Sequence, residues 1–383
     1  MRVAVVIPTC DRPDLLPRAL ASVAGQRRPP DEVIIVNDGV RPVDAPGARV
    51  VRSGPYAGPG AARNVGADAT RADVIAFLDD DDEWLHDYLS SVLPTLDSAD
   101  LALTSFIKEG SGGERVFEKV PPTTLHGADW VIRNQGLRGS NVVVRGDTFR
   151  RLGGFDELLS CGEDMDFAIR AAEARVSYRR VAEPLVVYHA HDGARLTSRG
   201  PRHRQAHRTW LAAQGDRLGP DQVAAYRART QELFGVDPGP PPSLVWILGP
   251  PGAGKTTWAK GHARGTDRVM DVDEILFWRD GADLGVRTAK RHLASMVRSV
   301  EEQRPVGDRR LFVTAAYLDP EDLGVLGSRE HVIGIVPART QWIARIERRD
   351  GYVHAAHAEE HTKWATRWGI GARAADAVGE AGA

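Results

Sequence analysis

Four consecutive aspartates, Asp79 to Asp82, follow an apolar run in the stretch FLDDDDEW at residues 77–84. Neighbouring carboxylates repel one another, so such a run is either solvated in a turn or neutralised by a bound cation. Asp79 and Asp81 can share one hard cation, and Mg²⁺ or Mn²⁺ typically binds few carboxylates together with the phosphate oxygens of a substrate. The residues by themselves leave both the solvated turn and the metal site open.

A second acidic cluster, GEDMDF at residues 162–167, contains Glu163, Asp164 and Asp166. A carboxylate can take a proton from an attacking hydroxyl, which is the role of a general base. Acidic side chains also stabilise the N-terminus of a helix, so a structural role is the alternative. The cluster on its own does not choose between the two.

The glycine-rich stretch GPPGAGKT at residues 249–256 satisfies the phosphate-binding pattern G-x-x-x-x-G-K-[ST]. The apolar run SLVWIL precedes it and can form a strand, and TTWAKGHA follows it and can begin a helix. Glycines let backbone N–H groups surround phosphates, Lys255 would reach the β- and γ-phosphates, and Thr256 would hold Mg²⁺. We therefore expect ATP and Mg²⁺ to bind through one set of residues: Gly249, Gly252, Gly254, Lys255, Thr256 and Thr257.

Short β-branched runs alternate with helical patterns in the first half of the chain, in the order strand, helix, strand, helix, strand. This order predicts an α/β fold, with a mostly parallel sheet and helices on both faces. Ligands of such sheets bind beyond the carboxyl ends of the strands, and here those ends carry PTCDRPD, NDG and the aspartate run. In the second half, the runs SLVWILG, RVMDVD, RLFVTAA and HVIGIVPA predict a second, smaller parallel α/β unit.

The clearest break in the sequence is GVDPGPPPS at residues 235–243, where prolines and glycines cannot continue a helix or a central strand. We expect a stiff, extended linker between two folded domains here. The first domain would span residues 1–234, with a core at 1–195 and a basic helical extension at 196–234, and the second would span 244–383.

The composition is that of an ordinary globular chain, with 383 residues, 42% apolar residues and a formal net charge of −2. So small a net charge supplies no global positive field to attract nucleic acid or a membrane surface. Cys10 and Cys161 are too few for a disulfide framework and lack the spacing of zinc ligands. No apolar window approaches the ~18 residues that span a bilayer, and the first apolar run is too short for a signal peptide, so we expect a cytoplasmic protein without a membrane span.

Several blocks of the first half occur in the order and spacing of the family-2 glycosyltransferases: VVIPTCDRPDLLPRAL, EVIIVNDG, GPGAARNVGADAT, FLDDDDEW, GSNVVVRGDTFRRLGGFDE and CGEDMDFAIR. Over about residues 1–195 the chain therefore resembles this family, which has the GT-A fold. The resemblance implies inverting transfer of a sugar from a nucleotide-sugar donor, expected to be a UDP-sugar, to an acceptor hydroxyl of unknown identity. It also implies Mn²⁺ or Mg²⁺ as the cofactor.

The same resemblance implies roles for individual residues. Asp79 and Asp81 match the D-x-D metal motif of the family, with Asp82 adjacent, which favours the metal site over the solvated turn. Asp164 matches the general base of the family, with Glu163 beside it. The residues implied to bind the donor nucleotide are Thr9, Asp11 and Arg12 at the base and ribose, Asp38 at a uracil-like ring, Arg63 near the diphosphate, and Asp80.

A histidine near the end of the resemblance is a further candidate. In similar enzymes a histidine after the acceptor loop can complete the metal site, which makes His189 of the stretch YHAHD a candidate ligand. His189 and His191 would lie on one face of an extended segment, but a lone histidine is more often structural, so both interpretations stay open.

The second half resembles the small P-loop kinases, a group that includes polynucleotide-kinase-like and adenylylsulfate-kinase-like enzymes. The resemblance implies phosphoryl transfer from ATP, with Asp271 and Asp273 of VMDVDEIL placed where such kinases carry an acid that orients the acceptor hydroxyl; Asp273 is the catalytic candidate. Thr314 and Ala315 stand where a Walker-B acid is often found, which weakens the case for activity, and Asp319 lies further on. The arginines implied to close over the nucleotide as a lid are Arg345, Arg348 and Arg349.

The leading hypothesis is a bifunctional enzyme, in which a metal-dependent glycosyltransferase is joined to an ATP-dependent kinase. A first alternative is modification of nucleic-acid bases, suggested by the basic stretch at 195–229 and disfavoured by the low net charge. A second alternative is a glycosyltransferase that is regulated by a nucleotide-binding but non-catalytic P-loop domain, suggested by the missing Walker-B acid. The oligomeric state cannot be inferred from these residues.

Overall fold

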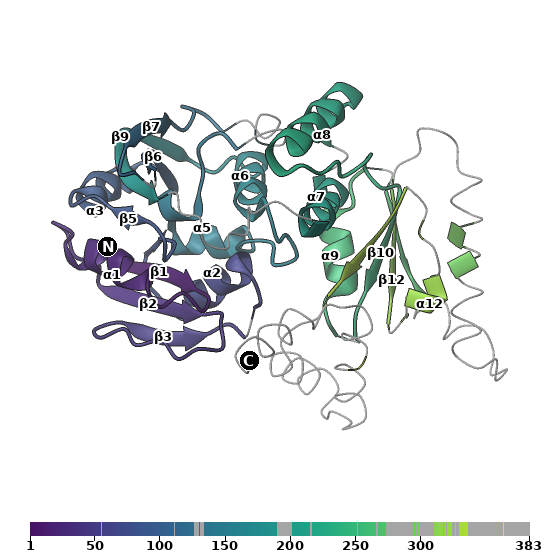
Figure 1. Ribbon diagram of the computed structural model, residues 1–383, viewed down its shortest axis with the longest axis horizontal. Helices are drawn as coiled ribbons and strands as arrows, with labels where there is room; N and C mark the ends of the chain where they lie inside the picture. Colours follow the sequence, from purple (N-terminus) through teal and green to yellow (C-terminus); the bar gives the residue numbers. More distant parts are fainter. Residues whose placement is uncertain are drawn as a thin grey trace. The chain divides into compact units, whose positions relative to one another are not determined.

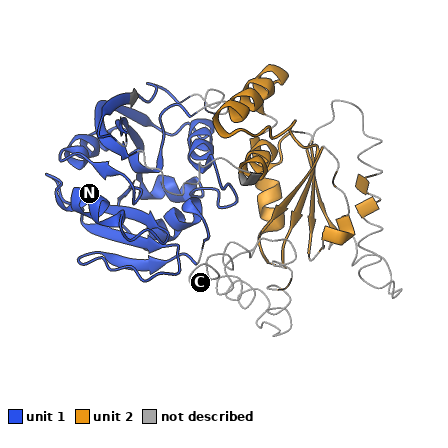
Figure 2. Ribbon diagram, in the orientation of Figure 1, with its two compact units in different colours: residues 1–198 blue, residues 199–383 orange. Residues whose placement is uncertain are grey.

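A computed structural model of the chain divides into two compact units, residues 1–198 and residues 199–383 (Figures 1 and 2). The residues that the structure describes are 1–54, 56–110, 112–125, 130, 134–189, 201–214, 217–250, 252–265, 267–272, 294–295, 297–298, 310–316, 318, 320–323, 326, 329–335 and 363.

The first unit is built on a nine-stranded mixed sheet with the order β3-β2-β1-β4-β8-β6-β9-β5, to which β7 adds beside β6. Strand β1 pairs in parallel with β2 and β4, as predicted for the first three strand-like runs, and β2 pairs in parallel with β3. The sheet as a whole was expected to be mostly parallel and is mixed. Beyond β4 the sheet is mixed, because β8 runs antiparallel to both β4 and β6. The strands are β1 Val3–Thr9, β2 Glu32–Asn37, β3 Arg49–Arg52, β4 Val74–Phe77, β5 Glu83–Trp84, β6 Leu101–Glu109, β7 Arg115–Lys119, β8 Val142–Arg145 and β9 Tyr178–His189.

Helices cover both faces of the parallel half, as its alternating pattern predicts. Successive residues of a strand point to opposite faces, and Val5 of β1 packs into the cluster that contains Leu16 and Val23 of α1. On the other face, α2 lies so close to the sheet that a Cβ at Gly66 would overlap Val6. The helices of this unit are α1 Leu16–Ala24, α2 Pro59–Asp68, α3 Tyr88–Val92, η1 Leu93–Asp97, η2 Gly139–Asn141, α5 Gly146–Arg151 and α6 Glu163–Glu173.

The described part of the second unit contains a four-stranded parallel sheet with the order β11-β12-β10-β13. Its strands are β10 Leu244–Leu248, β11 Arg268–Asp271, β12 Leu311–Ala315 and β13 Glu330–Gly334, which confirms the four predicted runs. Trp246 and Val313 are fully buried in its core, where each such side chain stabilises the fold by ~1.5–3 kcal/mol. The helices described here are α7 Pro201–Gln214, α8 Pro220–Phe234, α9 Lys255–His262 and α12 Pro320–Leu323.

The boundary between the units differs from the expected one. Residues 199–234, which were assigned to the first domain as its helical extension, belong to the second compact unit. The reason is that α7 binds the backbone of β13: Gln205 donates to the carbonyl of Val332 at 3.1 Å, and Arg208 donates to that of Glu330 at 2.7 Å. Arg208 also donates to the carbonyl of Pro238 at 2.9 Å, so the proline-rich stretch is packed within this unit and does not separate two domains.

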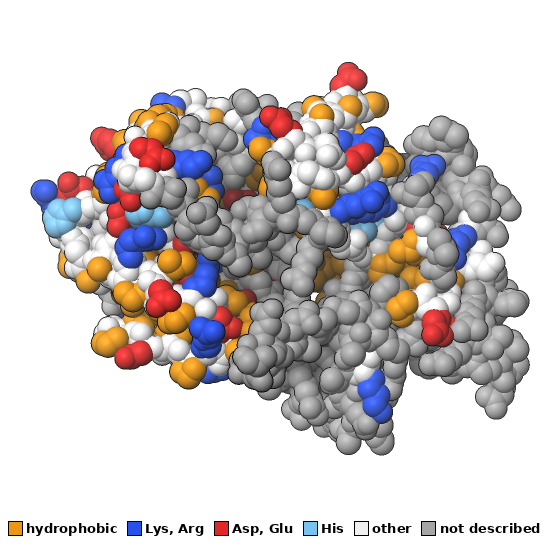
Figure 3. All heavy atoms as spheres, in the orientation of Figure 1, with side chains coloured by type: hydrophobic (Ala, Val, Ile, Leu, Met, Phe, Trp, Pro, Cys, Tyr) orange, Lys and Arg blue, Asp and Glu red, His pale blue; other side chains and the backbone are white. Residues whose placement is uncertain are grey.

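Charged side chains of both signs are interspersed over the described part of the face in Figure 3. Among the described residues, no helix combines the length and the apolar character needed to cross a membrane.

Candidate active site

Three parallel strands of the first unit end at the same edge of the sheet. The register pairs Thr9 of β1 with Asn37 of β2, and Val6 of β1 with Phe77 of β4, two residues before the aspartate run begins. Because parallel strands share one direction, their polar carboxyl ends gather at one edge, where open α/β sheets bind ligands. The carboxyl ends of β1, β2 and β4 therefore meet at the edge of the sheet where the sequence predicted a ligand site.

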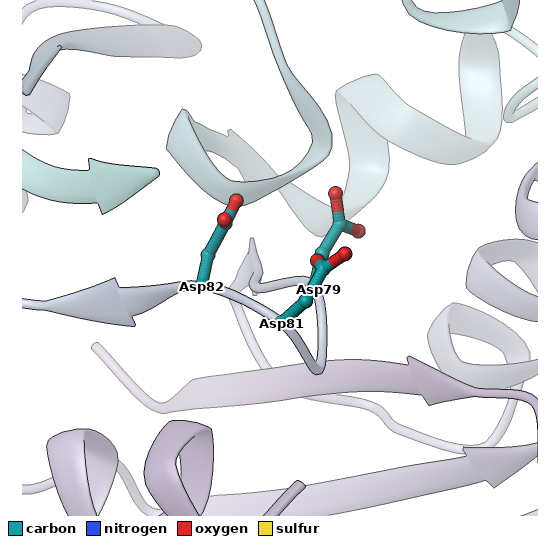
Figure 4. Close-up of side chains that lie close together, drawn as sticks. All are labelled: Asp79, Asp81 and Asp82. Atoms are coloured by element: carbon teal, nitrogen blue, oxygen red, sulfur yellow. The ribbon is translucent and has the colours of Figure 1, made fainter. Parts of the chain in front are cut away.

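Three of the four aspartates form one cluster at this edge. Asp79, Asp81 and Asp82 each offer a carboxylate oxygen, and these atoms lie within 4.8 Å of one another (Figure 4). Ser140 holds the cluster from the side of η2: its hydroxyl donates to Asp82 Oδ2 at 2.5 Å and accepts the backbone N–H of Asp79 at 3.1 Å. The spacing of the carboxylates suits a single divalent cation bound by oxygen ligands.

The burial of Asp82 tests whether these carboxylates suit a bound cation. Asp82 is 2% exposed, and its Oδ1 has no hydrogen-bond partner among the described residues. Burial raises the pKa of Asp82 well above the usual range, and the charges of Asp81 and Asp79 raise it further. A buried carboxylate oxygen without a partner is costly, and a cation shared with its neighbours would remove that cost.

Asp80, which was expected to bind the donor, is not part of the cluster. It is fully buried, accepts a hydrogen bond from Thr9 Oγ1 at 2.6 Å, and pairs with Arg12. Burial raises the pKa of Asp80 to about 7, even though Arg12 and Thr9 lower it. Asp80 therefore anchors the acidic turn to the end of β1, while Arg12 also reaches Asp81 at 3.1 Å.

Arg63 of α2 joins the aspartate cluster to the second acidic segment. Its side chain is almost fully buried and donates to Asp79 Oδ1 at 2.6 Å and to Glu163 Oε1 at 3.0 Å. Burial by itself lowers the pKa of Arg63, but the two carboxylates outweigh it and raise that pKa. The backbone of Gly139 lies against this pair, so a Cβ at Gly139 would overlap Arg63 and lie 2.7 Å from Asp79 Oδ1.

The general-base candidate Asp164 lies in the first turn of α6. Its Oδ1 accepts the N–H of Met165 at 2.7 Å, and its Oδ2 accepts the side-chain amide of Asn134 at 3.0 Å. Burial and the charge of Glu163 raise the pKa of Asp164 to about 7. A carboxylate with a pKa near neutrality is suited to accept a proton at physiological pH.

The two aspartates predicted to bind the base and ribose are engaged in shaping loops. Asp11 accepts the N–H groups of Val40 and Arg41 at 2.9 and 2.8 Å, and the hydroxyl of Tyr56 at 2.6 Å. Burial raises the pKa of Asp11, but these hydrogen bonds outweigh it and leave the pKa below its usual value. Its carboxylate therefore holds the loop after β2 against the loop after β1.

Asp38 is likewise committed within the protein. It is buried and accepts the hydroxyl of Ser53 at 2.6 Å and the N–H groups of Ala57 and Gly58 at 2.9 Å. Burial raises the pKa of Asp38 to about 6 against the effect of these donors. A cavity of ≈ 240 Å³ opens nearby at the end of β1, and its lining includes Thr9, Asp11, Arg12, Leu16, Leu20 and Arg41.

His189, the candidate additional metal ligand, lies outside the aspartate cluster. Its Nδ1 is 3.1 Å from Glu109 and its Nε2 is 3.6 Å from Glu83. Burial and the nearby charge of Arg18 lower the pKa of His189, despite its acidic neighbours. These contacts favour the structural interpretation; His191 lies outside the described residues.

Three residues of the segment before β8 were not assigned roles from the sequence. They are Asn134, Ser140 and Arg138, whose guanidinium lies 4.0 Å from the ring centroid of Tyr188. Ser140 lies in the block GSNVVVRGDTFRRLGGFDE, which resembles the glycosyltransferase family, but nothing in the sequence around a loop serine indicates which residue it contacts. Their contacts join positions far apart in the chain, so only the folded structure reveals them.

The glycine-rich loop of the second unit joins a strand to a helix, as its pattern predicts. Gly252 and Gly254 have φ of 73° and 96°, in the left-handed region that favours glycine, and α9 begins at Lys255. Lys255 Nζ donates to the carbonyls of Gly249 and Pro250, each at 3.0 Å. The loop thus curls around the lysine, which is 6% exposed.

Asp271, at the end of β11, supplies a carboxylate to this loop. Thr256 Oγ1 donates to Asp271 Oδ2 at 2.7 Å, and the parallel register places Asp271 beside Thr314 of β12. The predicted kinase residues Asp273, Arg345, Arg348 and Arg349, together with Asp319, lie outside the described residues.

Comparison with known proteins bears on the first unit. Residues 4–121 match the model of the family Glycosyl transferase family 2. The chain is 31% identical over 237 residues to the Pre-mycofactocin glycosyltransferase of Mycobacterium tuberculosis (strain CDC 1551 / Oshkosh), covering 55% of this chain and 44% of that protein. It is 27% identical over 258 residues to the Amylovoran biosynthesis glycosyltransferase AmsB of Erwinia amylovora, covering 59% of this chain and 81% of that protein.

Among solved structures, the crystal structure of S. aureus TarS 1–349 in complex with UDP-GlcNAc matches 62% of this chain and 74% of that chain. The TM-score of this match is 0.45 and the sequence identity is 19%. The chain spans less than half the length of the Pre-mycofactocin glycosyltransferase that it matches.

Proposed function

We propose that the first unit transfers a sugar from a nucleotide-sugar donor to an acceptor hydroxyl with the help of a divalent metal. The proposal starts from the match of residues 4–121 to the model of the family Glycosyl transferase family 2. The observation that carries the proposal is the cluster of Asp79, Asp81 and Asp82, with a buried oxygen of Asp82 that lacks a partner among the described residues. The cluster lies at the edge of the sheet where ligands bind, and Arg63 ties it to the segment of the candidate base.

Asp79, Asp81 and Asp82 would hold Mn²⁺ or Mg²⁺. When bound, the metal supplies positive charge that neutralises the diphosphate as it leaves the sugar. The chain's own part is to hold the three carboxylates together, through Ser140 on one side and Arg63 and Arg12 on the other.

Asp164 is proposed as the general base. Its carboxylate takes the proton of the acceptor hydroxyl while the acceptor oxygen forms a bond to the anomeric carbon of the sugar. The bond between that carbon and the diphosphate oxygen breaks at the same time, and its electron pair leaves with the nucleoside diphosphate. Attack from the face opposite the leaving group inverts the configuration of the sugar.

We propose a UDP-sugar as the donor and the cavity lined by Thr9, Asp11 and Arg12 as part of the nucleoside site. The cavity lies at the end of β1, beside the aspartate turn that Thr9 and Arg12 contact through Asp80. The names of the two relatives mention different compounds, pre-mycofactocin and amylovoran, so the acceptor is proposed no further than a hydroxyl group.

The test is hydrolysis of a panel of UDP-, GDP- and dTDP-sugars with and without Mn²⁺. The release of the nucleoside diphosphate is the quantity measured. Water then serves as the acceptor, so the natural acceptor need not be known. The proposal expects metal-dependent turnover that is largest for one UDP-sugar. Absence of metal-dependent turnover and of binding across the whole panel would contradict it.

For the second unit we propose binding of Mg²⁺-ATP by the loop at residues 249–256, with phosphoryl transfer as its activity. The contact between Thr256 and Asp271 supports this. In P-loop proteins Mg²⁺ is held by the threonine of the loop together with a nearby aspartate, and Thr256 and Asp271 would form such a pair. Strand β12 has Thr314 and Ala315 where that acid is often found, and Asp271 stands next to them on β11. The missing Walker-B acid would thus be replaced from the neighbouring strand.

Calorimetric titration with ATP and Mg²⁺ tests the binding, and a search for phosphorylated products tests the transfer. Binding together with a phosphorylated product supports the kinase. Binding that changes the rate of sugar-nucleotide turnover without such a product would instead support a regulatory nucleotide site. A protein that binds no ATP would contradict both versions.

A further inference from the structure

Asn134 contacts the carboxylate of Asp164, although the two residues are far apart in the chain. Its Nδ2 donates to Asp164 Oδ2 at 3.0 Å and also to the carbonyl of Leu137. Its Oδ1 accepts the N–H groups of Gly136 and Leu137, each at 2.8 Å. The side chain therefore closes its own turn and reaches the candidate base at once.

These contacts determine which way the amide faces. Two backbone N–H groups point at one end of the amide, and that end must be the oxygen, since an NH₂ group there would oppose two donors. The NH₂ end is left facing Asp164, to which it must donate. The turn at residues 134–137 thus presents a fixed hydrogen-bond donor to the carboxylate.

Among the described residues, the other groups around Asp164 are a backbone donor and several charged or titratable side chains. Met165 donates its backbone N–H to Oδ1 at 2.7 Å from within α6. The charged and titratable neighbours are Glu163 and Cys161 on the same segment, Arg63 from α2, and Arg138 from the segment before β8. Glu163 raises the pKa of Asp164, whereas Arg63 and Arg138 lower it.

We propose that Asn134 is a positioning residue for the proposed glycosyl transfer: it orients the Asp164 carboxylate by donating to Oδ2 and favours its ionised form. The inference rests on the proposed function, in which Asp164 accepts the proton of the acceptor hydroxyl. The two hydrogen bonds to Asp164 occupy one lone pair on each oxygen, and a carboxylate offers about four such sites, so capacity for the acceptor's proton remains.

The substitution Asn134→Asp tests the inference with little change of shape. The new side chain keeps an oxygen for the N–H groups of Gly136 and Leu137, and it replaces the donor facing Asp164 with a second carboxylate oxygen. A like charge at this distance raises the pKa of a carboxyl group, so the acidic limb of the pH–rate profile should move up by about one unit. Mn²⁺-dependent sugar-nucleotide turnover at pH 7 should fall about fivefold and recover toward the unchanged protein near pH 9.

A matched control is Asn64→Asp, on α2. The amide of Asn64 also bridges backbone groups, donating to the carbonyl of Phe155 at 2.9 Å and accepting its N–H at 2.8 Å. This variant makes the same chemical change without placing a charge at the Asp164 carboxylate, so its acidic limb should stay where it is in the unchanged protein. Thermal unfolding of both variants gives the structural cost of each change.

A pH profile of Asn134→Asp that matches the unchanged protein, or a loss of rate that is equal at every pH, would overturn the positioning role. If this variant does not fold, Asn134→Ser replaces it: the serine hydroxyl can still close the turn but is too short to reach Asp164, and the acidic limb should shift upward by a smaller amount. An acidic limb of Asn134→Ser that stays where it is in the unchanged protein would also overturn the positioning role. Absence of metal-dependent turnover in the unchanged protein would instead overturn the proposed function, and the positioning role with it.

Discussion

At the scale of single residues, the aspartate run divides into two functions. Asp79, Asp81 and Asp82 converge, whereas Asp80 is buried against Thr9 and Arg12. The N–H of Asp82 donates to the carbonyl of Asp79 at 3.2 Å, so the run forms a tight turn that directs neighbouring side chains differently. The repulsion among four adjacent carboxylates is reduced by the ion pairs that Arg12 and Arg63 form with the run and, we propose, by one cation.

Substitution of Asp81 by alanine should remove a metal ligand while leaving the buried anchor at Asp80 in place. We expect Mn²⁺-dependent sugar-nucleotide turnover to fall by about 100-fold or more, because removal of groups that hold a metal typically has an effect of this size. Release of nucleoside diphosphate and binding of Mn²⁺ give the two measurements. Asp87→Ala is the control, since Asp87 is half-exposed beside Arg27, and turnover at the normal rate in Asp81→Ala would remove the metal assignment.

The pH dependence of turnover should report Asp164. Burial and the charge of Glu163 raise the pKa of this carboxyl to about 7, and only its ionised form can accept a proton. Turnover should therefore be low at pH 5 and rise as the pH passes through about 7. Rate measurements from pH 5 to 9 check this, and Asp164→Asn should lose that limb; an unchanged limb in that variant would assign the base elsewhere.

At the scale of secondary-structure elements, Arg63 is the main tie of the site. From α2 it reaches Asp79 in the turn after β4 and Glu163 at the start of α6, so one guanidinium holds together three elements. Gly139 makes room for this arrangement, because any Cβ there would overlap the arginine. The geometry of the aspartate cluster is therefore coupled to the position of the α6 N-terminus.

Replacing Arg63 with alanine should destabilise the first unit strongly. The change leaves two poorly solvated carboxylates without their cation, and breaking a buried ion pair in this way costs about 3–5 kcal/mol. Urea unfolding measures the loss. Arg150→Ala provides the contrast: its ion pair with Asp147 is largely exposed and should contribute at most about 1 kcal/mol, so equal effects of the two changes would refute the structural role of Arg63.

At the scale of the whole molecule, each unit has its own sheet and its own buried core. The two proposed chemistries use separate sets of residues, with the aspartate cluster in the first unit and the glycine-rich loop in the second. We expect substitutions at one site to leave the other site intact.

Lys255→Ala is the test of that independence. Loss of its charged hydrogen bonds to phosphate, at ~1.5–3 kcal/mol each, should weaken ATP binding by roughly 10- to 100-fold or more. Mn²⁺-dependent sugar-nucleotide turnover should be unaffected, and Asp81→Ala should show the reverse pattern. Calorimetry and release of nucleoside diphosphate give the two readings; loss of both in a folded Lys255→Ala protein would disprove independent units.

Two arginines of the basic stretch at 195–229 make contacts within the second unit. Arg208 donates to the carbonyls of Pro238 and Glu330, and Arg227 pairs with Asp237. Arginines engaged in this way serve the packing of the second unit and present less positive charge to a phosphate backbone. The hypothesis that the chain modifies nucleic-acid bases stays a prediction.

The order of residues along the chain was enough to predict parallel strands in both units, the sheet edge at which the aspartate cluster lies, and the strand–loop–helix form of the glycine-rich loop. These features depend on local order: apolar runs of strand length, turn residues at their ends, and glycines at fixed offsets. The close approach of the Asp79 and Asp81 carboxylates was also predictable, because the motif places both residues in one short turn.

Tertiary structure alone decided how those residues are used. Asp82 joins the cluster while Asp80 anchors the turn, and Asp11 and Asp38 hold loops through hydrogen bonds to groups that the sequence does not place beside them. The contacts of Arg63, Ser140 and Asn134 connect segments far apart in the chain, and α7 joins the second unit through carbonyls of β13. A hydrogen bond depends on position and direction within a few tenths of an ångström, and those are set by packing of the whole unit, not by the residues on either side.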